Sequence, residues 1–335
     1  MSTATGTAPA LSDRTLTRLL RVSVVVLVLG LVAFGVFYYL DQHVAGPPSL
    51  VDQQITSAEA AVRKAPNDLD ARLQLAAVYQ ADKRNADALT QYDEILSADG
   101  TNRLALLGRG YVYLQQGSLD KARADYAAIT GAVASGEFAG ADPQLQEAYY
   151  YLGVIDVREK KPQEALTQLD AALKIEDTDS DALYQVGLAQ LQLNQPKLAV
   201  EAFTKALTFV PTGWCDPYTQ MAAAYTTLGG PQEASYATAM ATFCKGHTAQ
   251  AKTALQGLTD GPAGVDAMLG LALIAQTEGS TADAVGWYKK VLTVDHSNVQ
   301  AMSALSELGV GPKAATSGTA ATSAKSSSTS TQGHQ

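Results

Sequence analysis

The side chains that most often carry catalysis or bind metals are few in this 335-residue chain, and they lie far apart. The four histidines fall in different segments, and no spacing among them is typical of metal ligands: His43, His247, His296 and His334. The sequence contains no phosphate-binding loop, nucleophile elbow or Cys-x-x-Cys pair. Acid pairs such as Asp177 and Asp179 fall between predicted helices, where carboxylates usually cap. The sequence therefore predicts no catalytic residue, no metal site and no cofactor.

The two cysteines are the exception, because their spacing predicts that they meet. Gly229 and Gly230 mark the turn of a predicted helical hairpin, and Cys215 and Cys244 each lie fourteen residues from it. Asp216 is the expected N-cap of the first helix of this hairpin. In an oxidising compartment such a pair joins as a disulfide. The alternative is two buried thiols, so the prediction depends on where this part of the chain resides.

The composition indicates an all-α protein, because Ala, Leu and Gln dominate and Pro is sparse. The formal net charge is −9, and both ends of the chain are basic, so the acidity lies in the body. An acidic body repels phosphate backbones, which argues against a nucleic-acid partner. No small-molecule substrate is expected either.

One membrane span is predicted at residues 22–40. These nineteen residues carry no charge, and at about 1.5 Å per residue they are about 28 Å long, close to the bilayer core of ~30 Å. Arg14, Arg18 and Arg21 precede the run and Asp41 follows it, so residues 1–21 are expected in the cytoplasm and the rest outside. A cleaved signal peptide is the alternative, but the run is long for one and no good cleavage site follows. We therefore expect an uncleaved signal-anchor.

The region after a linker at residues 41–49 repeats with a period of 34 residues. Tyr79, Ala88 and Tyr92 recur 34 positions later as tyrosine, alanine and tyrosine, and Gly153 and Ala165 recur in the same way as Gly187 and Ala199. The pattern of small residues, an aromatic and a closing proline resembles the tetratricopeptide repeat (TPR) family, and the fullest copy ends at Phe203, Ala206 and Pro211. The resemblance implies a right-handed solenoid of helical hairpins over residues 50–309.

Six repeat units are expected, beginning near Leu69, Arg103, Gln146, Ser180, Cys215 and Val265. A lone helix at residues 55–66 would cap one edge of the stack, and residues 298–308 would cap the other. Two stretches depart from the period. Residues 132–145 are a predicted insertion, and residues 248–258 are a predicted extra helix. Residues 310–335 consist of Ser, Thr, Ala, Gly and Lys with almost no bulky side chain, which predicts a disordered tail.

The resemblance also implies a partner-binding groove, formed by four positions of the first helix of each unit. The side chains at these positions in the first four units are mostly apolar or aromatic, and they include Leu73, Leu107, Tyr111, Leu114, Tyr150, Val154, Val157, Tyr184, Leu188 and Leu191. Such a groove suits an amphipathic helix or an extended apolar peptide. These side chains could instead pack between units. We expect a membrane-anchored scaffold for a protein partner at the outer face of the membrane. The alternative is an assembly factor of cytochrome c maturation, whose TPR part residues 50–130 resemble.

Overall fold

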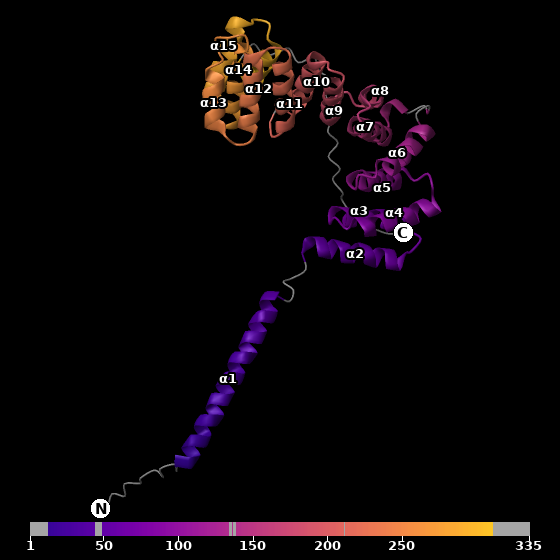
Figure 1. The fold of residues 1–335 in the computed structure, drawn as a ribbon, viewed down its shortest axis with the longest axis vertical. Helices are drawn as coiled ribbons and strands as arrows, with labels where there is room; N and C mark the ends of the chain where they lie inside the picture. The colour runs from indigo at the N-terminus through magenta and orange to yellow at the C-terminus, as the bar shows by residue number, and fades with distance from the viewer. Residues whose placement is uncertain (1–12, 44–48, 134–135, 137–138, 211, 311–335) are drawn as a thin grey trace, which may run out of the picture. The chain divides into compact units, whose positions relative to one another are not determined.

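In the computed structural model, the described residues are 13–43, 49–133, 136, 139–210 and 212–310, and they contain helices but no strand (Figure 1). Residues 311–335 of the tail predicted at 310–335 and the helix-ending Pro211 lie outside the described residues. The chain divides after Gly117 into two compact units. The all-α prediction is confirmed.

The first unit holds a long apolar helix, a lone helix before the repeats, one complete hairpin and the first helix of the next repeat. Its helices are α1 (Asp13–His43), α2 (Leu50–Lys64), α3 (Leu69–Ala81), α4 (Asn85–Ala98) and α5 (Arg103–Gln115). Helices α2 to α5 pack consecutively around a core that includes Leu75, Tyr79, Tyr92 and Ile95. Within α1, residues Arg21–Tyr39 have a mean hydropathy of 2.4 and none of them is buried. This stretch is long and apolar enough to cross a membrane.

The second unit continues the hairpins and includes the predicted extra helix. Its helices are α6 (Leu119–Val133), η1 (Ala139–Ala141), α7 (Pro143–Arg158), α8 (Pro162–Ile175), α9 (Ser180–Gln192), α10 (Pro196–Phe209), α11 (Cys215–Thr227), α12 (Pro231–Cys244), α13 (Thr248–Gln256), α14 (Gly264–Thr277), α15 (Thr281–Val294) and α16 (Val299–Glu307). Consecutive helices pack against one another throughout. Helix α16 buries Ala301 and Leu305 against α15, as a capping helix should.

A left-handed residue occurs at the same place in each of the six predicted hairpins. The residue fourteen positions after each predicted start has a φ between 55° and 75°: Lys83, Gly117, Lys160, Asn194, Gly229 and Gly279. This conformation ends the first helix and turns the chain into the second. Glycine adopts it without steric cost, whereas the two lysines and the asparagine occupy it at a small cost.

Small residues allow the two helices of a hairpin to approach closely, as the repeat pattern predicts. A Cβ atom added at Gly187 of α9 would lie 2.3 Å from Cε1 of Phe203 on α10. One added at Gly153 of α7 would lie 2.6 Å from Cγ of Leu169 on α8. The large side chain of one helix therefore fills the space that the glycine of the other leaves open.

Several helix boundaries differ from the prediction for local reasons. Helix α7 begins at Pro143 rather than near Gln146, because the carboxylate of Asp142 accepts the amide hydrogens of Gln144 and Leu145. Helix α2 begins at Leu50, where Ser49 and Asp52 form a capping box. The extra helix α13 ends at Gln256, two residues early. The N-cap predicted at Asp216 was wrong. Helix α11 already begins at Cys215, so Asp216 lies in its first turn.

Candidate functional site

The predicted groove positions differ in how much surface they offer to a partner. Leu107, Leu114 and Val157 are buried, with 4–8% of their surface exposed. Tyr111, Tyr150, Tyr184, Leu188 and Leu191 are partly exposed. A partner that follows these helices would touch mainly the second set, because the first set already packs inside the hairpins. That a partner binds at any of these positions stays a prediction.

Tyr184 of α9 lies in an aromatic cluster. Its ring centroid is 5.5 Å from that of Phe203 and 5.1 Å from that of Trp214. Burial and the nearby carboxylate of Asp216 raise its pKa, against a hydrogen bond with Gln220 that lowers it. The ring is therefore anchored by aromatic packing, while part of the side chain stays accessible.

Tyr150 of α7 lies beside a second aromatic stack. Its ring is 5.0 Å from that of Tyr151, which in turn stacks at 5.0 Å on Tyr126 of α6. Tyr126 is completely buried, whereas Tyr150 is partly exposed. Tyr150 is thus the outermost ring of a stack that begins in the core.

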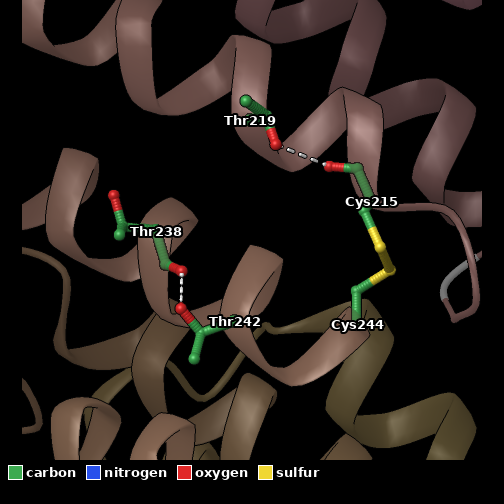
Figure 2. Close-up of a disulfide and its surroundings, with 5 residues drawn as sticks. All are labelled: Cys215, Thr219, Thr238, Thr242 and Cys244. Atoms are coloured by element: carbon green, nitrogen blue, oxygen red, sulfur yellow. Dashed lines mark hydrogen bonds between the residues drawn. A yellow bond between two sulfur atoms is a disulfide. The ribbon is translucent and has the colours of Figure 1, made fainter. Parts of the chain in front are cut away.

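The two cysteines form a disulfide in the structure, as their spacing predicts. Cys215 in the first turn of α11 is joined to Cys244 in the last turn of α12, with a Cα–Cα distance of 5.4 Å (Figure 2). The bond therefore closes the open end of the hairpin opposite the turn at Gly229. Two threonine hydroxyls bond to the backbone near the disulfide: that of Thr219 donates to the carbonyl oxygen of Cys215 in α11, and that of Thr242 donates to the carbonyl oxygen of Thr238 in α12 (Figure 2).

A buried ion pair between α6 and α7 was not predicted from the sequence. Arg123 Nη2 is 2.6 Å from Asp156 Oδ1 and 2.8 Å from Glu159 Oε2, and Asp156 is 1% exposed. The two residues are 33 positions apart, nearly one repeat, which places them on adjacent helices. That spacing is the only signal in the sequence that could have pointed to the pair. The pair joins α6 to α7.

No cluster of three or more metal-ligating side chains occurs within the described ranges. The fold defines a class of protein: a helical-repeat protein that presents side chains from successive hairpins.

Comparison with known proteins identifies the family of this scaffold. The tetratricopeptide repeat family model matches residues 73–137, 152–213 and 236–297, more than half of the chain. The chain therefore belongs to the tetratricopeptide repeat family. Proteins with this fold bind peptide or protein partners and are typically scaffolds rather than enzymes. No curated protein sequence is significantly similar to this chain.

Several solved structures are similar to parts of this chain at low sequence identity. A MamA protein is 22% identical over 54% of this chain and 94% of its own, with a TM-score of 0.46. A tetratricopeptide repeat protein from Parabacteroides merdae is 17% identical over 82% of this chain and 95% of its own, with a TM-score of 0.46. YrrB, described as having an unusual peptide-binding site, is 20% identical over 60% of this chain and 99% of its own, with a TM-score of 0.45. The alternative of cytochrome c maturation stays a prediction.

Proposed function

We propose that this protein is a membrane-anchored scaffold that holds a protein partner at the outer face of a membrane. The observation that carries the proposal is the combination, in one chain, of an apolar N-terminal helix and a set of tetratricopeptide hairpins. In this proposal residues 22–40 span the bilayer, residues 41–49 link the span to the repeats, and residues 50–309 bind the partner. The anchor would raise the local concentration of the scaffold near membrane-bound partners.

Two features support the outward orientation of the repeats. Arg14, Arg18 and Arg21 precede the apolar segment, and the positive-inside tendency retains such a flank in the cytoplasm. The disulfide between Cys215 and Cys244 would persist in an oxidising compartment but not in the cytoplasm. The two arguments are independent, because one rests on residues before the span and the other on residues of the fifth repeat.

The orientation is tested with a reporter enzyme that is active only in the cytoplasm, fused after Gln335. We expect the fusion to be silent, and a fusion of the same reporter to residues 1–21 alone to be active. Activity of the fusion after Gln335 would reverse the topology and remove the reason for the disulfide to persist.

The partner is expected to contact the partly exposed tyrosines of the second unit. Crosslinking in intact membranes, followed by purification of the full chain, should capture the partner. Changing Tyr150 and Tyr184 together to Ala should weaken capture, because exposed aromatic anchors dominate binding when a partner desolvates them. Tyr126→Ala is the matched control. Tyr126 is fully buried, so its loss should lower stability by about 3–5 kcal/mol. A double Tyr variant that melts early and captures the partner normally would assign these rings to the core.

A further inference from the structure

The extra helix α13 changes how the fifth and sixth repeats pack. In the second unit, the first helices α7 and α9 of two successive repeats touch. Helix α13 lies between α12 and α14 in the chain and packs against both, so α14 contacts mainly α13, α15 and α12. Thr248–Gln256 has no counterpart in the other repeats, which is why the packing changes here.

A cavity of about 110 Å³ lies where this change occurs. That volume is roughly ten times what a single water molecule requires, so the cavity has room for one side chain. Five helices of the second unit line it: α10, α11, α12, α14 and α16. The lining residues are Thr204, Leu207, Thr208, Tyr218, Met221, Tyr225, Tyr236, Met240, Asp266, Leu269, Gly270, Leu273 and Gln300.

The polar part of the cavity is electronegative. It holds three tyrosines and one carboxylate, Asp266, and no basic residue is among the described side chains that line it. Asp266 makes no hydrogen bond or ion pair within the described residues, and burial followed by repulsion from Glu233 raises its pKa. Its place in the first turn of α14 favours the ionised form. A cation beside this half-buried carboxylate would therefore favour its ionised form.

Tyr225 and Tyr236 lie within electrostatic reach of Asp266, and Tyr236 lies within reach of Tyr218 and Tyr225. Burial, with nearby Tyr218, Asp266 and Tyr225, raises the pKa of Tyr236 well above its usual value. Burial, with Asp266 and Glu233, raises the pKa of Tyr225 to about 12. Burial also raises the pKa of Tyr218 to about 12. All three tyrosines thus stay neutral at physiological pH, and neutral aromatic rings attract cations through their faces.

The remaining walls suit the aliphatic part of a long side chain. Leu207, Met221, Leu269 and Leu273 line the cavity, and methionine adapts its shape to what it contacts. Gly270 has no Cβ atom, and one placed there would lie 2.8 Å from Sδ of Met240. The absence of a side chain at this position keeps α14 close to α12 at the edge of the cavity.

We propose that this cavity binds the side chain of a lysine or arginine from the protein partner. The aliphatic stem would lie against the methionine and leucine side chains, and the cationic group would lie between the tyrosine rings and the Asp266 carboxylate. The proposal rests on the proposed function, since a protein partner supplies the side chain. It adds a requirement that the apolar groove does not imply, namely a basic residue in the bound segment.

The test uses the full chain in detergent and fluorescein-labelled, acetylated nonapeptides of Ala, Gly and Ser. The central residue of each peptide is Lys, Arg, norleucine or Glu, and affinity is measured by fluorescence anisotropy. We expect the Lys and Arg peptides to bind at least about tenfold more tightly than the norleucine and Glu peptides. Equal binding of all four peptides, or binding of none, would overturn the proposal and leave a cavity that holds water only.

Substitutions identify the site. Asp266→Asn should weaken binding of the Lys peptide about tenfold, which corresponds to about 1.4 kcal/mol. Asp260→Asn is the matched control, because it removes the same charge from an exposed residue in the turn before α14 and should leave binding unchanged. Tyr225→Leu should weaken binding of the Lys peptide and should change binding of the norleucine peptide little. Equal losses with Asp260→Asn and Asp266→Asn would mean that net charge alone attracts the peptide, which contradicts the proposal.

The same variants separate this inference from the proposed function. If crosslinking captures a partner equally well with wild type and Asp266→Asn, the scaffold stands and the cation site is wrong. If the Lys peptide binds in an Asp266-dependent way but no protein is captured from membranes, the cation site stands and the scaffold function is wrong. If Lys313→Gln and Lys325→Gln tighten peptide binding, the chain's own tail occupies the cavity, which contradicts a partner as the occupant.

Discussion

Removing the guanidinium of Arg123 should destabilise the second unit strongly, because it leaves a buried carboxylate without its cation. Arg123 Nη2 lies 2.6 Å from Asp156 Oδ1, and the other oxygen of Asp156 is buried without a hydrogen-bond partner. Removing one member of a buried ion pair lowers the free energy of unfolding by ~3–5 kcal/mol. The Arg123 side chain is 31% exposed, so water screens the ion pair in part. The loss of stability should therefore lie near the lower end of this range. For Arg123→Met, which keeps an unbranched stem, we expect a loss of about 3 kcal/mol.

A double variant shows whether the unpaired charge causes the loss. Arg123→Met with Asp156→Asn has no buried charge, so it should lose only about 1–2 kcal/mol, the cost of an unsatisfied amide. Lys252→Met is the surface control, because Lys252 and Glu278 are 2.9 Å apart with both side chains 40% exposed. An exposed pair of this kind contributes less than ~1 kcal/mol.

The assay is urea unfolding of the full chain in detergent, followed by far-ultraviolet circular dichroism. A lower midpoint with an unchanged slope reports a loss of stability alone. The reasoning is refuted if Arg123→Met costs no more than Lys252→Met. It is also refuted if the double variant is less stable than Arg123→Met, because the charge left on Asp156 would then not be the source of the cost.

Three further predictions concern packing, the disulfide and pH. Gly187→Ala should lower stability by about 1–3 kcal/mol in urea unfolding, because its Cβ would lie 2.3 Å from the ring of Phe203. Gly286→Ala, with no atom within 4 Å of the new Cβ, should instead raise stability by up to ~1 kcal/mol, and equal effects would contradict the packing argument. Cys244→Ser should lower stability by about 3–4 kcal/mol, because the bond to Cys215 closes a loop of 29 residues. Reductant should lower the wild-type melting temperature similarly and leave the variant unchanged. Finally, the raised pKa of Asp266 means that the folded state holds this proton to higher pH than the unfolded chain does. Its contribution to stability is complete below about pH 3.8 and is lost as pH rises through the folded-state pKa. As pH rises, the melting temperature of Asp266→Asn should therefore fall less than that of wild type. Identical dependence of the two melting temperatures on pH would show that Asp266 titrates normally.

Local sequence signals predicted much of the fold. The 34-residue period placed the starts of three first helices correctly, at Leu69, Arg103 and Ser180. It succeeded because each repeat buries the same positions in the same hairpin, so identical residue types recur at equal spacing. The equal distances of Cys215 and Cys244 from the turn at Gly229 predicted their contact for the same reason. The start of α7 was predicted near Gln146, later than Pro143, because the prediction used the 34-residue period and not the N-cap residue Asp142.

The sequence by itself thus determined the type of each element, the partners of each helix within a hairpin, and the apolar segment before them. These depend on neighbours in the chain and on a regular period. Only the tertiary structure decided which groove positions are buried, that Arg123 meets Asp156, and that Asp266 joins three tyrosines around one cavity. The cavity depends on how α14 packs after the extra helix α13 interrupts the period. No repeat in the sequence encodes that arrangement, because it results from the balance of contacts among five helices.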